Sequence, residues 1–208
     1  MAFIVSIDGN IAAGKTTILQ EIEKQGYPVF YEPFEDNIYL EDFYREQGEY
    51  ATRVQQYFLT LRRNQFLAAQ HSFCDPDRIV FIERSIFTDK YIFANMLYQE
   101  DKISEQDWKA YIFHFETLKH NKPDFAIVLN VRADICLERI KDRSRDMESS
   151  IPIDYLQKVD SYYNLYGHNL GVTVRKNYYP FEPDEIARII TGTAETEVAK
   201  IKIVKDRV

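Results

Sequence analysis

Residues 9–16 read Gly-Asn-Ile-Ala-Ala-Gly-Lys-Thr and fit the pattern G-x-x-x-x-G-K-[S/T]. An apolar run, residues 3–7, precedes the motif, and a helix-like stretch, residues 17–22, follows it. A strand, a glycine turn and a helix in that order present free backbone N–H groups to a polyanion. We therefore expect Lys15 to reach the β and γ phosphates of a nucleotide and Thr16 to hold Mg²⁺. A glycine-rich turn that binds nothing is the alternative.

The composition favours a single domain, residues 1–208, because a chain of 208 residues with 45% hydrophobic content can bury one sizeable core. A net charge of −7 argues against a general nucleic-acid-binding surface. Cys74 and Cys136 lie far apart without zinc-like spacing, which favours a reducing compartment. No apolar run approaches the roughly 18 residues of a membrane span, so we expect a cytoplasmic protein with no membrane partner.

Strand-like and helix-like segments alternate along the chain, which predicts an α/β fold with a five-stranded parallel sheet flanked by helices. Four strands are expected at residues 3–8, 29–31, 79–82 and 125–131. Pro180 and Pro183 interrupt the pattern after these segments. The fifth strand has two competing candidates, residues 187–191 and 200–204, and we expect the first of them.

Two long stretches between the expected strands are rich in helix-forming residues. Residues 40–73 carry apolar side chains at helical spacing, which indicates packed helices. Residues 86–120 predict a further helical pair, broken near residues 101–104.

Charged residues follow the second and third expected strands. Glu32 follows residues 29–31, and Glu83 and Arg84 follow residues 79–82. In a doubly wound sheet the carboxyl ends of the strands converge, so these side chains are expected beside the glycine motif. Glu32 is a candidate base for a hydroxyl that attacks a phosphate, Glu83 a candidate Mg²⁺ residue, and Arg84 a candidate partner of Glu32. A solvated glutamate and a structural ion pair are the alternatives.

Three arginines crowd together at positions 139, 143 and 145, after a helical segment that begins near Asp134. Arg139 and Arg143 share a helix face, and like charges repel one another unless an anion lies among them. A mobile lid, about residues 140–150, that closes Arg139, Arg143 and Arg145 on a triphosphate explains the cluster. A solvated helix face is the alternative.

Taken together, these motifs resemble the deoxynucleoside kinase family, whose members include deoxycytidine, deoxyguanosine and deoxyadenosine kinases. The matching pieces cover most of residues 3–160, and they are G-N-I-A-A-G-K-T-T at 9–17, E-P at 32–33, V-Q-Q-Y at 54–57, E-R-S-I-F-T-D-K-Y-I-F-A at 83–94 and R-I-K-D-R-S-R-D-M-E-S-S-I-P-I-D-Y-L at 139–156. The resemblance implies a P-loop kinase fold with an arginine-rich lid.

Roles for individual residues follow from the resemblance. It implies that Glu32 is the base for the 5′-hydroxyl, that Glu83 assists the metal, and that Arg84 supports the reacting oxygens. The donor phosphates would lie against Arg139, Arg143, Arg145 and the loop Gly9, Asn10, Ile11, Ala12, Ala13, Gly14, Lys15, Thr16 and Thr17. The nucleoside would lie against Tyr44 and Glu148 at its 3′-hydroxyl, Gln55 at the base edge, and Phe93 on the base face.

Arg62 and Asp89 bear on the choice of nucleobase. Arg62 lies seven residues after Gln55, so both point from one helix face, and a buried guanidinium needs a carboxylate such as Asp89. The pair resembles that of members that accept deoxycytidine and purine deoxynucleosides rather than thymidine. An ordinary interhelical salt bridge is the alternative.

The expected activity is the ATP-dependent, Mg²⁺-assisted phosphorylation of a deoxynucleoside 5′-hydroxyl in nucleotide salvage, with a nucleoside triphosphate and a deoxynucleoside as ligands. Family members are commonly homodimers, so the resemblance also implies a homodimer. Two other functions stay open, namely a nucleoside monophosphate kinase of the thymidylate kinase type and a non-catalytic structural relative. The stretch from Phe34 to Leu40 lacks the tryptophan that animal members carry after the E-P pair.

Overall fold

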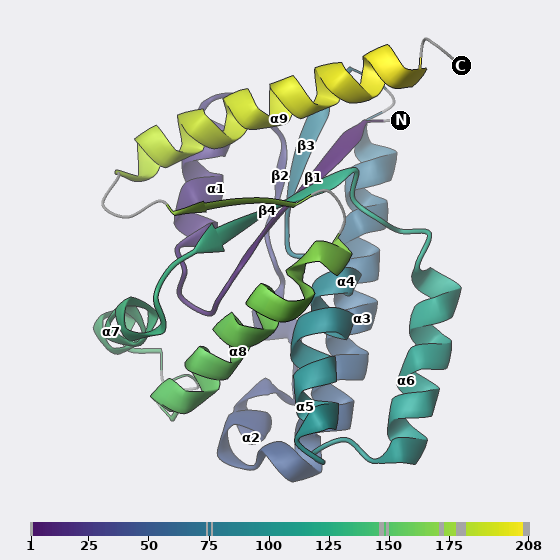
Figure 1. Ribbon diagram of the computed structural model, residues 1–208, viewed down its shortest axis with the longest axis vertical. Helices are drawn as coiled ribbons and strands as arrows, with labels where there is room; N and C mark the ends of the chain where they lie inside the picture. The colour runs from purple at the N-terminus through teal and green to yellow at the C-terminus, as the bar shows by residue number, and fades with distance from the viewer. Residues whose placement is uncertain are drawn as a thin grey trace.

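A parallel sheet forms the centre of the computed structural model, which describes residues 2–73, 75, 77–145, 148, 150–170, 173–177 and 182–205 (Figure 1). The strands lie in the order β2-β3-β1-β4-β5, and every neighbouring pair is parallel. Their bounds are β1 Phe3–Gly9, β2 Val29–Phe30, β3 Ile79–Glu83, β4 Phe125–Asn130 and β5 Thr173–Asn177. The α/β prediction is confirmed, and four strands lie where the sequence predicted them.

Helices connect consecutive strands, as parallel pairing requires. The α-helices are α1 Lys15–Lys24, α2 Leu40–Arg45, α3 Gln47–Ser72, α4 Ile86–Thr88, α5 Asn95–Gln99, α6 Glu105–Leu118, α7 Ala133–Arg143, α8 Ile153–Tyr166 and α9 Pro183–Lys205. A π-helical turn, η2 Asp89–Ala94, joins α4 to α5, and the short 3-10 turns are η1 Phe34–Asp36 and η4 Gly167–Leu170. The predicted break near residues 101–104 is confirmed, because α5 ends at Gln99 and α6 begins at Glu105. Ser104 caps the start of α6 by accepting a hydrogen bond from the backbone of Asp107.

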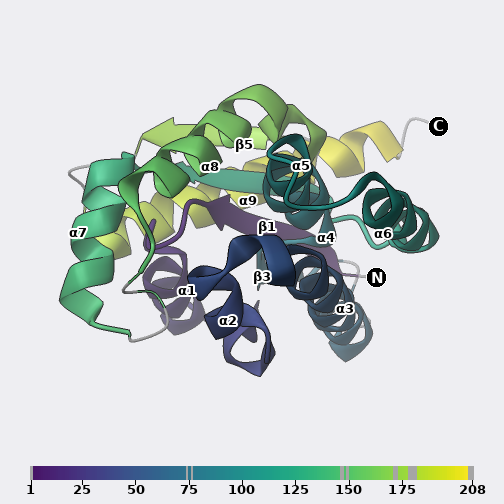
Figure 2. The same cartoon turned by 90° about the horizontal axis from the view of Figure 1, so that it is seen from below.

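Helices cover both faces of the sheet. Alternate residues of a strand point to opposite faces, and Ile4, Val80 and Ile82 pack with Phe66 and Ala69 of α3 on one of them. Figure 2, seen from below, shows α5 and α8 in front of the sheet and α9 behind it, where α9 packs against α1. Two-sided coverage explains why β1 is buried along its whole length, and its two polar side chains, Ser6 and Asp8, form a hydrogen bond with each other.

The prediction of a strand at residues 187–191 is wrong, because α9 spans Pro183–Lys205 and includes both candidate strands. Ile186, Ile190, Ala194 and Val198 are all buried at a spacing of four residues, which is a helix face. Pro183 lies at the first helical position, where a residue needs no backbone N–H donor. The proline that looked like an interruption therefore begins the helix.

The strand that pairs with β4 on its far side is β5, which the sequence analysis did not identify. It is short and carries Arg175 and Lys176, so it lacks the apolar run that marks the inner strands. Several residues singled out from the sequence lie outside the described residues. They are Cys74, Pro180 and, within the expected lid, Asp146, Met147 and Ser149.

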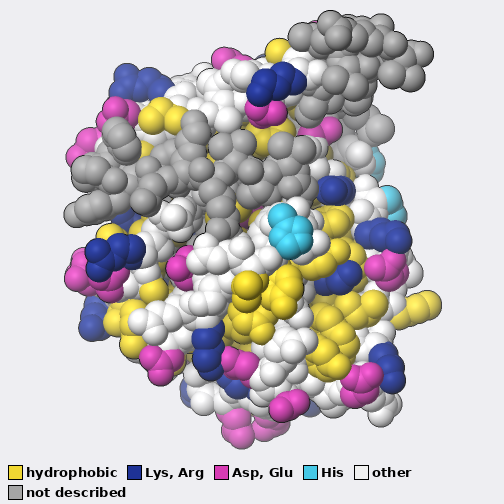
Figure 3. All heavy atoms as spheres, viewed as in Figure 1, with side chains coloured by type: hydrophobic (Ala, Val, Ile, Leu, Met, Phe, Trp, Pro, Cys, Tyr) yellow, Lys and Arg dark blue, Asp and Glu magenta, His cyan; other side chains and the backbone are white. Residues whose placement is uncertain are grey.

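Basic and acidic side chains are interspersed on the face drawn in Figure 3, and hydrophobic side chains gather near its centre. Within the described ranges, each helix is either too short or too polar to cross a lipid bilayer. The sheet topology brings the carboxyl ends of β1 and β3 together, with α1 beginning just beyond β1. Residues that follow these strands therefore lie close to one another.

Candidate active site

A cavity of about 730 Å³ lies at the carboxyl ends of the strands. Every site residue predicted from the sequence lines it except Gly9 and Asn10. Predicted residues on its wall are Ile11, Ala12, Ala13, Gly14, Lys15, Thr16, Thr17, Glu32, Tyr44, Gln55, Arg62, Glu83, Arg84, Asp89, Phe93, Arg139, Arg143, Arg145 and Glu148. The volume lies in the range of small-molecule sites.

The glycine loop, residues 9–14, runs from the end of β1 to the first turn of α1. Gly14 adopts a left-handed conformation with φ 92° and ψ 14°, which glycine takes at little cost. Lys15 is buried, donates a hydrogen bond of 2.9 Å to the carbonyl oxygen of Asn10, and lies 4.0 Å from Glu83. Burial, with help from the nearby charge of Arg84, lowers the pKa of Lys15 to about 8. An ammonium group is therefore held over the loop in a desolvated site.

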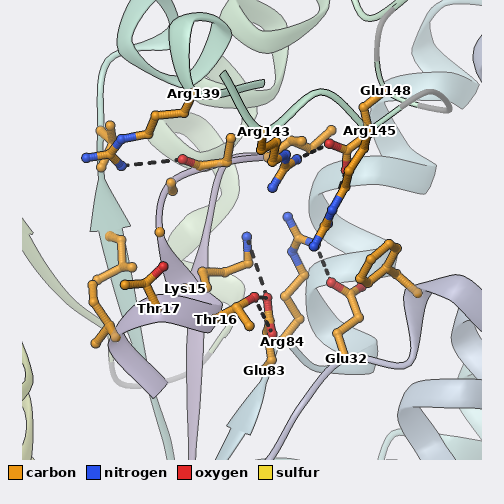
Figure 4. A pocket seen from close by; sticks show the side chains of 18 of the residues that line it. Lys15, Thr16, Thr17, Glu32, Glu83, Arg84, Arg139, Arg143, Arg145 and Glu148 are labelled. Atoms are coloured by element: carbon orange, nitrogen blue, oxygen red, sulfur yellow. Dashed lines mark hydrogen bonds and ion pairs between the residues drawn. The ribbon is translucent and has the colours of Figure 1, made fainter. Parts of the chain in front are cut away.

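Thr16 and Glu83 meet beside Lys15, as Figure 4 shows. The hydroxyl of Thr16 lies 3.2 and 3.1 Å from the two carboxylate oxygens of Glu83. Hydroxyl and carboxylate oxygens are the hard ligands that Mg²⁺ prefers, so the donor set fits that ion. Among the described residues, no three His, Cys, Asp or Glu side chains come together as a metal cluster. A cation here would need further oxygens from a bound phosphate chain.

Glu32 lies buried between two guanidinium groups. It accepts a hydrogen bond of 2.7 Å from Arg84 through one oxygen and pairs with Arg62 through the other. Burial alone would raise the pKa of Glu32, but the charges of Arg62 and Arg84 outweigh burial and lower the pKa to about 2. Glu32 is therefore a carboxylate at every ordinary pH.

Arg84 has an unusual backbone for a residue other than glycine, with φ at 61°. Such left-handed conformations cost roughly 1–3 kcal/mol and persist only where the surroundings hold them. Arg84 N–H donates to the carbonyl of Ile7, and its guanidinium contacts both Glu32 and the carbonyl of Gly9. The guanidinium also lies 5.1 Å from the ring centre of Phe93. These contacts direct the side chain into the cavity.

The predicted ion pair between Arg62 and Asp89 is present, and both side chains are fully buried. Arg62 also contacts Glu32, a relationship that was not predicted. Gln55 is buried on the same face of α3, seven residues before Arg62. Its Oε1 lacks a hydrogen-bond partner within the described part of the chain. A buried acceptor without a partner is costly, so it marks a place where a ligand donor fits.

The arginines divide between α7 and the residues that follow it. Arg139 and Arg143 lie on α7, and Arg145 follows Ser144, which turns the chain with φ at 47°. Arg143 forms an ion pair with Glu148, and Arg145 lies 3.7 Å from the same carboxylate. Arg139 donates a hydrogen bond of 3.4 Å to the carbonyl of Ala12 in the glycine loop. Glu148 thus partly balances the charge of this cluster.

Tyr44 lies on α2 near the Glu148 carboxylate. Burial, followed by the charge of Glu148, raises the pKa of Tyr44 well above its usual range, so its hydroxyl stays protonated. Phe93 lies on η2 with its ring on the cavity wall. In Figure 4, Glu32 and Glu148 lie on one side of the cavity, and Thr17, which follows the glycine loop, lies on the other.

Several cavity residues were missed from the sequence. Phe58 lies on α3 between Gln55 and Arg62, and the Arg62 guanidinium lies 4.5 Å from its ring centre. The spacing of three and four residues on one helix was the signal that could have identified it. Phe34, Val54 and Tyr155 also line the cavity, and so do Leu40, Phe43, Glu182 and Ile186. Most of these residues look like ordinary core residues, because an apolar side chain on a cavity wall has the same local sequence pattern as one in the core.

Comparisons with known proteins agree with this geometry. The deoxynucleoside kinase family model matches residues 5–191. A deoxyguanosine kinase of Dictyostelium discoideum is 36% identical over 166 residues, which is 78% of this chain and 58% of that protein's length. A deoxyadenosine kinase of the same organism is 31% identical over 199 residues, which is 92% of this chain and 79% of that protein.

Solved structures resemble this chain as well. The structure of a deoxyadenosine kinase from M. mycoides with bound dCTP superposes with a TM-score of 0.78 at 25% identity, covering 93% of this chain and 100% of the other. The same enzyme with bound dATP gives a TM-score of 0.77 at 27% identity, over 92% and 99% of the two chains. With its glycine loop, buried acids and arginines in one cavity, the chain belongs to the deoxynucleoside kinase family.

Proposed function

We propose that this chain, as one domain, transfers the terminal phosphoryl group of ATP to the 5′-hydroxyl of a deoxynucleoside. The observation that carries the proposal is the position of Glu32, a buried and ionised carboxylate that shares a cavity with Lys15 and Arg84. One half of this cavity has the cationic groups that a triphosphate needs. The other half has aromatic side chains and paired polar groups, which suit an uncharged nucleoside.

Glu32 would accept a hydrogen bond from the 5′-hydroxyl and orient its oxygen toward the phosphorus atom. A carboxylate with a pKa near 2 is a weak base, so its main contribution is to orient the hydroxyl and take its proton late. Phosphoryl transfer passes through a loose transition state that needs little base strength, and therefore this arrangement is sufficient. Arg84, hydrogen-bonded to Glu32, would support the oxygens between which the phosphoryl group moves.

Lys15, Arg139, Arg143 and Arg145 would neutralise the donor phosphates, with loop N–H groups from residues 11–16 around them. The arginines would act as a lid over the donor. Thr16 and Glu83 would hold Mg²⁺, which when bound draws charge away from the phosphate oxygens. Glu148 would exchange its contact with Arg143 for the sugar 3′-hydroxyl, with Tyr44 beside it.

The base pocket favours deoxycytidine and purine deoxynucleosides. Gln55 and Asp89 present buried acceptors, and Arg62 presents donors, to one edge of a base stacked on Phe93. An exocyclic amine satisfies such acceptors, whereas thymine has only one N–H group and a methyl group to accommodate. The M. mycoides relative was solved with bound dCTP and with bound dATP, which is consistent with amine-bearing bases.

A nucleoside monophosphate kinase is the main competing function. It needs a free basic group for the phosphate of its acceptor, but Arg62 and Arg84 are already paired with Glu32 and Asp89. A non-catalytic relative is disfavoured because Lys15 and Glu32 both lie in the cavity.

Initial rates with ATP, Mg²⁺ and each of the four natural deoxynucleosides test the proposal, with deoxycytidine monophosphate as the competing acceptor. We expect deoxycytidine or a purine deoxynucleoside to react fastest. A higher rate with the monophosphate would indicate the competing kinase, and no turnover with any acceptor would contradict catalysis.

A further inference from the structure

The hydroxyl of Tyr163 contacts both backbone polar groups of Gly9. Tyr163 lies on α8 and is 3% exposed. Its oxygen accepts a hydrogen bond of 3.1 Å from the Gly9 N–H and donates one of 3.0 Å to the Gly9 carbonyl. A hydroxyl has one donor and two acceptor sites, so the Tyr163 side chain can bond to the N–H and the carbonyl of Gly9 at the same time. These bonds join two segments that lie far apart in the chain.

Gly9 is the point where β1 ends and the glycine loop begins. Its φ is 140°, and a Cβ atom there would lie 2.8 Å from the carbonyl oxygen of Leu129 on β4. The Gly9 carbonyl also accepts a hydrogen bond of 3.2 Å from Arg84, whose other terminal nitrogen donates to Glu32. The same carbonyl therefore links Tyr163 with the arginine that holds the proposed base.

A second contact ties α8 to the loop, since the Asn10 side chain donates a hydrogen bond of 2.8 Å to the carbonyl of Leu156. Burial, followed by the charge of Asp8, raises the pKa of Tyr163 well above its usual range, so its hydroxyl keeps its proton. In the described part of this chain, a buried tyrosine hydroxyl does not always have hydrogen-bond partners. The hydroxyl of Tyr111 is equally buried and has no hydrogen-bond partner within the described residues.

We propose that Tyr163 is a positioning residue for phosphoryl transfer, which fixes Gly9 and thereby holds Arg84 in line with Glu32. The inference rests on the proposed function. Tyr163 does not line the cavity, so it acts through Gly9 and Arg84 and has no contact with substrate. Without its hydroxyl, the Gly9 N–H loses its acceptor and the carbonyl is free to shift away from Arg84.

The test is Tyr163→Phe, which removes one oxygen and keeps the ring. We expect kcat to fall at least about tenfold, since small misplacements of reacting groups have effects up to roughly 10²-fold. The KM for the deoxynucleoside should stay nearly constant, because the hydroxyl of Tyr163 bonds to Gly9 and not to the predicted base residues Gln55, Asp89 and Phe93. A loss of stability alone would lower Tm and leave kcat unchanged at temperatures well below Tm.

Tyr111→Phe is the matched control, because it makes the same substitution at a buried site outside the cavity. Its kcat should equal that of the unaltered chain. An unchanged kcat in Tyr163→Phe, or an equal fall in both variants, would overturn the inference while leaving the proposed function intact. If the unaltered chain showed no turnover, the proposed function and the inference would fail together.

Discussion

Arg84 donates a hydrogen bond of 2.7 Å to Glu32, and both side chains are buried at the cavity wall. The contact joins the residue after β3 to the segment after β2, across neighbouring strands of the sheet. Since Arg62 approaches the same carboxylate from α3, Glu32 is fixed from two directions. This arrangement makes Glu32 the residue whose replacement is most informative.

Glu32→Gln should lower kcat by roughly 10²- to 10⁴-fold, the usual contribution of a general base. Glutamine has the same shape but cannot accept a proton, while Lys15 and the loop are unaltered. ATP binding, measured by calorimetry, should therefore stay near normal. Glu41→Gln on the exposed face of α2 is the control and should keep full activity. Near-normal turnover in Glu32→Gln would remove this residue from the mechanism.

Arg143→Ala should lower kcat by roughly 10²- to 10³-fold, the scale of one lost charged donor to a transition state. Lys141 lies on the same helix, is exposed, and does not line the large cavity. Lys141→Ala removes one positive charge at a similar place in the chain and should change kcat little. Equal losses in the two variants would indicate a general charge effect, with no special position for Arg143.

Arg62→Met should make activity sensitive to acid. In the unaltered chain the charge of Arg62 is the largest influence that keeps the pKa of Glu32 near 2, against burial. Without it the pKa of Glu32 rises, so the carboxylate becomes protonated as the pH falls through the new, higher value. The acid limb of kcat/KM should therefore move to higher pH. Arg53→Met, an exposed change on α3, should leave the profile where it was.

Two Gly→Ala substitutions should have opposite effects on the free energy of unfolding. Gly9→Ala would place its Cβ 2.8 Å from a backbone oxygen at a positive φ, so we expect a loss of stability. Gly192 lies in α9 with nothing within 4 Å of an added Cβ. Gly192→Ala should stabilise the chain by about 0.5–1 kcal/mol, since alanine favours helices. Urea unfolding measures the change in the free energy of unfolding for both variants. A Gly9→Ala variant as stable as the unaltered chain would contradict the close packing of Gly9 against Leu129.

The parts of the fold that the sequence predicted are those with strong local signals. β4 is a long apolar run, and Lys15 and Thr16 lie in a motif whose spacing fixes their place. α9 was missed because Ile186, Ile189 and Ile190 are β-branched residues, which favour strands, and only the contact with α1 shows which face is buried. The helix propensities of neighbouring residues do not reveal that a distant segment will bury one face of a helix.

The same distinction holds for the site. The contact between Arg62 and Asp89 was predicted because a buried guanidinium needs a carboxylate and because the pair resembles one in the deoxynucleoside kinase family. The contacts of Tyr163 with Gly9 and of Arg62 with Glu32 join segments from different parts of the chain. No periodicity relates such residues, so only the assembled structure reveals them.

The pairing of Arg62 and Arg84 with Glu32 and Asp89 makes the nucleoside half of the cavity electrically balanced, with two positive and two negative groups. The donor half keeps an excess of positive charge, because Arg143 and Arg145 share the carboxylate of Glu148 and Arg139 donates to the uncharged carbonyl of Ala12. Dissolved salt screens unbalanced charge far more than a neutral cluster. Rising ionic strength should therefore lower the affinity for the triphosphate and leave the affinity for the nucleoside almost unaltered.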